Sequence, residues 1–216
     1  MKPFVLPEEF KKKKIILHLC ADIGSDSRYF QLDDNFAVIR IGVDIGVENF
    51  TYDGEVYGVI ANPPCTEFST ARYDITRDTS KGMSLVEHCL RIIEEVNPKF
   101  WVMENPAKGT LHKFIGKPKH IYHPWQYGNP WTKMTALWGE FNMPTPLHSK
   151  WEEVTLNPDI YVRAGRKPSL AVLHKSAIQF MPEYSWCADR IKCDADIRSL
   201  CSDGFAKALY LANKDW

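Results

Sequence analysis

Two side chains in this sequence have the chemistry of a covalent catalyst. Cys65 lies in the segment GVIANPPCTEFSTAR (58–72), directly after an apolar run and two prolines, and Glu104 ends the apolar segment KFWVMEN (99–105). A free thiol is only slightly ionised at neutral pH, so a nucleophilic Cys65 needs exposed backbone N–H groups or a helix start nearby. Desolvation would raise the pKa of Glu104 and let it carry a proton. Together they suit attack on an electron-poor heterocycle whose ring nitrogen must be protonated. The alternative is that Cys65 only fills a gap in the core.

The segments that would position these side chains alternate between strand and helix patterns. Residues 84–97 carry apolar side chains at helical spacing and begin with a capping-box pattern at Ser84 and Glu87, and residues 202–214 form a second amphipathic segment. Continuous apolar strands alternating with helices predict an α/β fold, with a mostly parallel sheet covered by helices on both faces. The predicted strands are residues 15–20, 36–46, 55–64 and 99–105, whereas strand patterns are weak beyond residue 106.

The predicted strand ends place several polar residues on one rim of that sheet. In open parallel sheets, ligands bind beyond the carboxyl ends of the strands, where the strand order reverses. The turn ADIGSDS (21–27) follows the first strand, and Asp44 falls twenty residues after Gly24, the usual offset of an acid that binds a ribose. The alternative for Asp44 is a helix N-cap. Cys65 and Glu104 fall on the same rim.

Composition limits the partners of this chain. Its 216 residues suit one domain with a small appendage, and 27 basic residues balance 27 acidic ones, so any nucleic-acid binding must use local basic patches. The segments 107–120 and 161–176 are two such patches. We expect no membrane contact and a reducing cytoplasm, because the sequence shows no membrane-length apolar stretch, no signal-peptide pattern and only six cysteines. We also expect no metal site, since the spacing of Cys187, Cys193 and Cys201 is unlike that of zinc ligands.

In order along the chain, these segments resemble the motifs of the DNA cytosine-5 methyltransferases, particularly small phage-type and prokaryotic members. LHLCADIGSDS and GVDI are similar to the two S-adenosylmethionine motifs, ANPPCTEFS to the nucleophile loop, and WVMENP to the Glu-Asn motif. YGNPWTKMTALWG (127–139) resembles a segment of the small members, and RSLCSDGFAKAL (198–209) resembles the last motif. Pro-Pro-Cys followed by Glu-Asn-Pro is the most specific part of the resemblance.

The resemblance implies a Rossmann-like S-adenosylmethionine-dependent methyltransferase fold. Residues 1–140 would form the catalytic domain, 141–195 a small target-recognition-like region, and 196–216 a C-terminal helix that completes the catalytic domain. Cys65 would add to carbon 6 of a flipped cytosine in DNA, Glu104 would protonate ring nitrogen 3, and carbon 5 would take the methyl group. We expect a monomer in the cytoplasm, or the host cytoplasm if the chain is phage-encoded; an RNA substrate and a restriction partner stay open.

The resemblance also assigns binding residues, one position at a time. Asn105 is expected to fix the loop more than to touch the base. The expected cofactor-binding residues are Cys20, Ala21, Asp22, Ile23, Gly24, Asp44, Ile45, Asn62, Pro63 and Phe205. The expected substrate-binding residues are Pro64, Ser69, Asn105, Lys133, Thr135, Arg163, Arg166 and Lys167.

Two positions depart from the family pattern and keep other interpretations open. Asp22 stands where the family has a glycine, and His18 stands where it has an acidic residue. The Asp22 carboxylate could bind the ammonium of the methionine part of the cofactor or repel its carboxylate. One alternative is therefore a catalytically impaired nucleic-acid-binding module. The other is an exocyclic-amino methyltransferase, whose Asn-Pro-Pro loop needs an aromatic ring where this chain has Cys65.

Overall fold

The protein is built on one six-stranded sheet. The computed structural model describes residues 3–42, 46–69, 76–160 and 166–216. The strand order is β2-β1-β3-β4-β6-β5. β1 is parallel to β2 and β3, β3 is parallel to β4, and β6 is antiparallel to β4 and β5. The predicted α/β class with a mostly parallel sheet is confirmed. The strands are β1 (Lys14–Leu19), β2 (Phe36–Ile41), β3 (Gly58–Ala61), β4 (Phe100–Pro106), β5 (His120–Tyr122) and β6 (Thr135–Glu140).

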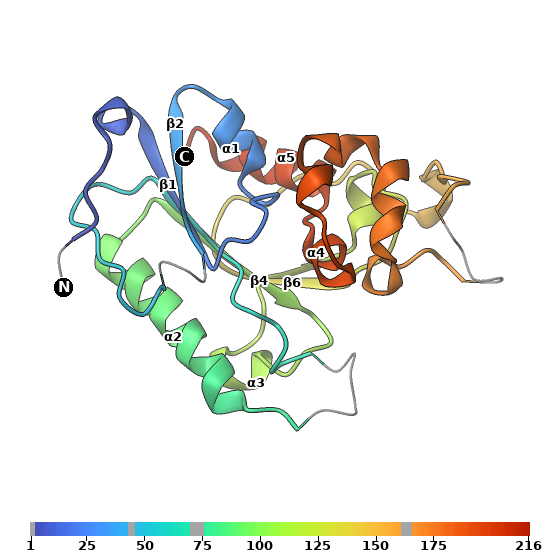
Figure 1. The fold of residues 1–216 in the computed structure, drawn as a ribbon, viewed down its shortest axis with the longest axis horizontal. Coiled ribbons are helices and arrows are strands. Elements are labelled where there is room, and N and C mark those ends of the chain that lie inside the picture. Colours follow the sequence, from blue (N-terminus) through green and yellow to red (C-terminus); the bar gives the residue numbers. More distant parts are fainter. Residues whose placement is uncertain (1–2, 43–45, 70–75, 161–165) are drawn as a thin grey trace.

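Helices cover both faces of the sheet (Figure 1). α2 (Thr79–Val96) and α3 (His112–Ile115) lie on one face, and α1 (Arg28–Leu32) and α5 (Asp203–Asn213) lie on the other. Alternate side chains of β1 point to these two faces, so Ile15, Leu17 and Leu19 share a core with α2, and Ile16 shares one with α1 and α5. The remaining helical segments are α4 (Asp194–Ser199) and the 3-10 helices η1 (Glu8–Phe10), η2 (Pro124–Tyr127), η3 (Trp151–Glu153), η4 (Leu170–Val172), η5 (Lys175–Phe180) and η6 (Pro182–Arg190).

A third, smaller core lies under the 3-10 helices of the C-terminal third. Its largest members are Trp131 and Tyr184, and Leu170 and Ile197 are also fully buried there. Ile23, from the turn after β1, belongs to the same cluster. This part of the chain therefore packs directly onto that turn. No helix among the described residues is both long and apolar enough to cross a membrane.

Several element boundaries differ from those predicted. α2 begins at Thr79 rather than at Ser84, because the Asp78 side chain accepts a hydrogen bond from the Lys81 backbone N–H at 3.1 Å and caps the helix earlier. β3 covers only four of the ten residues predicted for it, and two of those left out are prolines, which cannot donate to a strand ladder. β2 ends at Ile41, and the predicted Asp44 and Ile45 lie outside the described residues. β5 and β6 lie where the sequence pattern was weak.

Candidate active site

The strand order reverses at β1, which is the place where open α/β sheets bind ligands. β2 lies on one side of β1 and β3 on the other, so the crevice opens beyond the carboxyl ends of these strands. The loop 20–27 follows β1 and the segment 62–65 follows β3. Glu104 lies two residues before the end of β4, the next strand along. The turn after β1, the Cys65 loop and Glu104 thus belong to one rim, as predicted.

The Cys65 loop is a tight turn that Asn105 holds against the sheet. The Cys65 carbonyl accepts hydrogen bonds from the backbone N–H groups of Phe68 and Ser69, at 3.0 and 2.7 Å. Asn105 is fully buried and donates from Nδ2 to the Pro63 carbonyl at 2.9 Å, while its Oδ1 has no partner within the described part of the chain. This bond ties the loop after β3 to β4.

The thiol of Cys65 is exposed, but its surroundings do not ionise it. Desolvation and then the Glu104 carboxyl raise the pKa of the Cys65 thiol, and the Lys133 ammonium lowers it by less. Within the described part of the chain, the next helix after Cys65 is α2, which starts at Thr79. Of the two alternatives that the sequence suggested for activating this thiol, the described residues include the loop.

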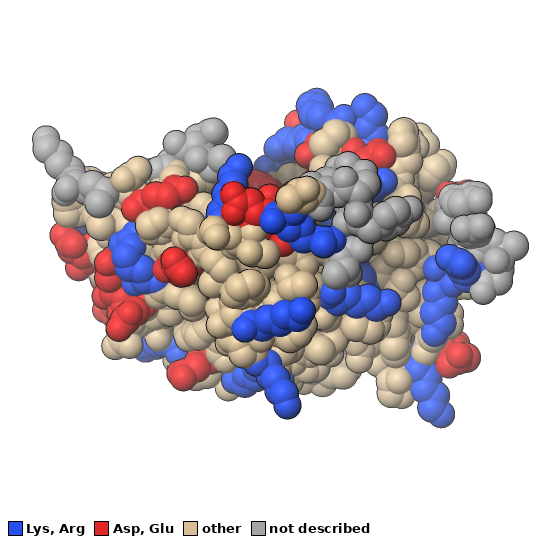
Figure 2. Space-filling model, turned by 90° about the horizontal axis from the view of Figure 1, so that it is seen from below, with Lys and Arg blue, Asp and Glu red and all other residues tan. Residues whose placement is uncertain are grey.

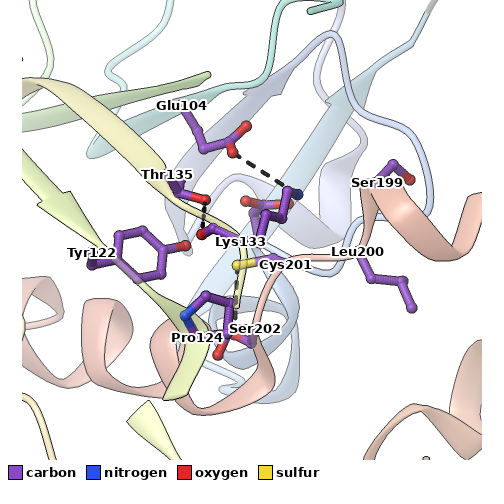
Figure 3. A pocket seen from close by; sticks show the side chains of 10 residues that line it. Glu104, Tyr122, Pro124, Lys133, Thr135, Ser199, Leu200, Cys201 and Ser202 are labelled. Carbon is purple, nitrogen blue, oxygen red and sulfur yellow. Dashed lines mark hydrogen bonds and ion pairs between the residues drawn. The ribbon is translucent and has the colours of Figure 1, made fainter. Parts of the chain in front are cut away.

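Glu104 and Lys133 face each other across the site (Figure 3). The Lys133 Nζ lies 4.0 Å from Glu104 Oε1, and each side chain is about one-fifth exposed, at 19% and 20%. Desolvation raises the pKa of Glu104, the direction its apolar flanks predicted, and Lys133 acts against it. Burial lowers the pKa of Lys133, but the carboxyl groups of Glu104 and Asp26 outweigh that effect and raise it. The Thr135 hydroxyl donates to the Lys133 carbonyl at 3.1 Å and steadies this segment.

A buried chain of polar side chains links the turn after β1 to this pair. His18 Nδ1 lies 2.9 Å from the Ser27 hydroxyl, and His18 Nε2 lies 2.7 Å from Asn62 Oδ1. Asn62 Nδ2 donates to Asp26 Oδ1 at 3.2 Å. Burial lowers the pKa of His18, so the ring is neutral and fits both partners. Sequence reasoning missed Asp26; the only signal was a polar turn, which is common after strands.

The turn after β1 has the form of a ligand cradle at two positions. Cys20 and Gly24 both adopt positive φ, at 51° and 86°. The Ile23 carbonyl accepts from Arg40 and Arg190, at 2.8 and 3.1 Å, and Ala21 N–H donates to the end of β2 at 3.1 Å. Asp22 is exposed, and its carboxylate lies 3.4 Å from the Gly24 N–H. Backbone and carboxylate at this edge fit a ligand that carries an ammonium group.

The site encloses one small cavity behind Glu104 and Lys133. Its volume is about 10 Å³, which is about the space for one water molecule, so a pyrimidine ring cannot enter until the walls move. Figure 3 shows the C-terminal segment 199–202 along one side of this space. The lining residues are Asp26, Glu104, Tyr122, Pro124, Lys133, Thr135, Ser199, Leu200, Cys201 and Ser202. Of these, sequence reasoning named Glu104, Lys133 and Thr135.

Other predicted site residues do not line this cavity. Phe205 is 2% exposed, and its ring stacks on Tyr122 with centroids 4.0 Å apart, so it packs behind the cavity wall and offers a ligand almost no surface. Pro64 is exposed beside Cys65, and Ser69 is half-buried. Arg166 is exposed, and the Lys167 ammonium lies 4.8 Å from the centre of the Trp151 ring. Arg163 lies outside the described residues.

Parts of the chain are similar to known methyltransferases. Residues 31–115 match the model of the C-5 cytosine-specific DNA methylases, and this stretch contains both Cys65 and Glu104. A protein of Frog virus 3 (isolate Goorha), described as a DNA (cytosine-5)-methyltransferase, is 27% identical over 126 residues, which cover 50% of this chain and 57% of that protein. The type II methyltransferase M.AquIA of Picosynechococcus is 41% identical over 63 residues, covering 29% and 25% of the two chains.

Among solved structures, a protein encoded within an E. coli prophage and described as a DNA modification methyltransferase aligns with a TM-score of 0.43. It is 13% identical, and the alignment covers 75% of this chain and 55% of that one. The chain thus spans 57% and 25% of the lengths of the two curated relatives.

Proposed function

We propose that this chain methylates carbon 5 of cytosine in DNA, because its residues 31–115 match the model of the C-5 cytosine-specific DNA methylases. One observation carries the proposal. The Asn105 side chain bonds the Pro63 carbonyl at 2.9 Å, which fixes the Cys65 loop next to the strand that carries Glu104. A nucleophile and a carboxyl acid are thereby held on one rim at the switch point of the sheet.

The proposed reaction assigns one task to each of these two side chains. The Cys65 thiolate adds to carbon 6 of a flipped cytosine, while the protonated Glu104 donates to ring nitrogen 3. Carbon 5 becomes electron-rich and bonds the methyl group. The carbon-5 proton then leaves to water and the nitrogen-3 proton returns to the Glu104 carboxylate, and these steps break the bond between carbon 6 and sulfur and restore Cys65. S-adenosylmethionine, when bound, supplies the electrophilic methyl group.

The residues after β1 and β3 are those that would hold this cofactor. We propose that the loop from Cys20 to Gly24 surrounds the methionine part of the cofactor. The exposed Asp22 carboxylate would accept hydrogen bonds from its ammonium group. Asn62 and Pro63 would line the adjacent side of the cofactor site. The Asp44 carboxylate would accept hydrogen bonds from the ribose hydroxyls. Asp22 therefore replaces a glycine of the family without removing the cradle.

DNA contacts are proposed for the surface beyond this rim. Pro64, Ser69, Lys133 and Thr135 would line the path of the flipped base. Residues 141–195 would act as a small target-recognition region whose Arg163, Arg166 and Lys167 contact phosphates, and residues 1–140 with 196–216 would form the catalytic domain. We propose that the chain acts as a monomer in the cytoplasm.

Mechanism-based trapping tests the proposal. A pool of random-sequence DNA duplexes that carry 5-fluorocytosine is incubated with the protein and S-adenosylmethionine. Because fluorine cannot leave carbon 5 as a proton does, the adduct should persist through denaturation. Mass spectrometry should place it on the peptide that contains Cys65 and not on the Cys20 or Cys89 peptides.

Two controls sharpen the result. Cys65→Ser should fold and give no adduct, because a neutral alcohol is a much weaker nucleophile, and a parallel RNA pool shows which polymer is the substrate. Methyl transfer to DNA with no adduct at Cys65 contradicts the covalent mechanism. Neither transfer nor adduct with either pool favours the impaired binding module, for which the raised pKa of the Cys65 thiol and the small cavity are the supporting observations.

A further inference from the structure

One buried carboxyl group in the site has no task in the proposed reaction. Asp26, from the turn after β1, is 7% exposed and lines the same small cavity as Glu104 and Lys133. An ionised carboxylate is rarely buried unless it is paired or hydrogen-bonded. Asp26 accepts a hydrogen bond from Asn62 at 3.2 Å, and Asn62 is fixed in turn by the neutral His18 ring. The fold therefore directs this carboxyl group into the site and holds it there.

The titratable groups around Asp26 come from several separate parts of the chain. Burial raises the pKa of Asp26 to about 6, with Asp22 adding to this effect and Lys133 opposing it. Asp26 in turn raises the pKa of both Glu104 and Lys133. Two carboxyl groups thus act on a single ammonium, which lies 4.0 Å from Glu104. The titratable and charged groups that face this arrangement are Asp22, Cys65, Glu104, Lys133 and Cys201, with Tyr122 on the cavity wall and His18 behind Asn62.

We infer that Asp26 is a positioning residue of this site. Its carboxyl group shares the Lys133 ammonium with Glu104, and Lys133 therefore favours the ionised form of Glu104 less strongly. The inference rests on the proposed function only for its consequence, namely that Glu104 needs that proton when Cys65 attacks. With Asp26 neutral, Lys133 would interact with Glu104 alone and would hold it in the ionised form. A smaller fraction of Glu104 would then carry a proton at neutral pH.

The sharpest test reads the Glu104 carboxyl directly. The pKa of Glu104 is measured by carbon-13 NMR in the full-length protein, with the signal assigned from Glu104→Gln. Asp26→Asn keeps the shape and an oxygen for Asn62 but removes the charge, and it should lower the pKa of Glu104 by about 1 unit. In a Lys133→Met background the same change should shift the Glu104 pKa by less than half as much, because only the direct repulsion between the two carboxyl groups is then left.

The outcomes separate the inference from the proposed function. No shift of the Glu104 pKa in Asp26→Asn, or an equal shift in both backgrounds, overturns the inference. In a methylation assay, Asp26→Asn should move the alkaline fall of the rate to lower pH. If the wild-type protein methylates no DNA, the proposed function fails, but the NMR titration still decides whether Asp26 shares Lys133. The exposed Asp34→Asn should change neither readout.

A stability measurement guards against a merely structural role. The folded protein holds the pKa of Asp26 at about 6, above its ordinary 3.8, so its ionisation destabilises the fold as pH rises through that range. Asp26→Asn should therefore unfold at a higher urea concentration than wild type at pH 7.5, with the difference vanishing below pH 4. A residue kept only for stability would show the opposite change at pH 7.5, and that result would count against the inference.

Discussion

At the scale of single residues, Cys65 places a pH requirement on the proposed reaction. Desolvation and the Glu104 carboxyl raise the pKa of its thiol, so alkylation of Cys65 by iodoacetamide should be slow at neutral pH and should rise steeply in the alkaline range. Glu104→Gln removes the neighbouring carboxylate. The midpoint of Cys65 alkylation should then move to lower pH, because less negative charge opposes the thiolate.

Peptide-resolved mass spectrometry measures this alkylation. The exposed Cys193, which lies in another part of the fold, is the internal control, and its pH profile should be the same in both proteins. An unchanged Cys65 midpoint in Glu104→Gln would show that the two side chains do not interact in solution.

At the scale of elements, the first turn of α5 packs directly against the backbone of η2. A Cβ added at Gly204 would come within 1.8 Å of the Tyr127 carbonyl oxygen, so no larger residue fits without moving the helix. Gly204→Ala should reduce the free energy of unfolding by about 1–3 kcal/mol, measured by urea denaturation. Both elements lie next to the cavity wall, through Ser202 and Pro124.

Lys207→Ala on the exposed side of α5 is the matched control and should change stability by less than about 0.5 kcal/mol. Equal stability of Gly204→Ala and wild type would mean that α5 and η2 are less closely packed than the structure has them.

At the scale of the whole molecule, the balanced charge would leave the proposed DNA binding to a few local contacts. Figure 2 shows Lys and Arg side chains spread over one face and interspersed with acidic ones, rather than a continuous basic field. With few phosphate contacts, binding should depend only modestly on salt. Replacing Arg166 and Lys167 together by Ala should weaken DNA binding and lower the slope of log K against log salt by about 1–2.

Fluorescence anisotropy with a labelled duplex at several salt concentrations gives this slope. The matched control is the double variant in which Lys11 and Lys12 are replaced by Ala. These residues lie just before β1 and far in sequence from Arg166 and Lys167. If both double variants lose the same affinity for DNA, binding depends on the total charge of the protein and not on specific contacts of Arg166 and Lys167.

The sequence by itself determined the framework of this protein. Continuous apolar runs and helical spacing gave the parallel sheet and its covering helices, because burial on both faces constrains every residue of a strand. It also placed Cys65 and Glu104 on one rim of the sheet, because each residue lies at the end of an apolar segment that reads as a strand. The start of α2 was misplaced because two polar positions in sequence both look like caps, and only Asp78 makes the bond.

Only the tertiary structure decided what surrounds these two side chains. Lys133 reaches Glu104 because β6 pairs antiparallel with β4, in a register that no local pattern encodes. Asp26 meets Asn62 because the loops after β1 and β3 adjoin at the switch point, 36 residues apart in sequence. The pKa of a buried group depends on every charge and void around it, and those come from distant segments. The residue types in the sequence therefore show which reactions are possible. The packing of distant segments decides whether Cys65 and Glu104 are protonated.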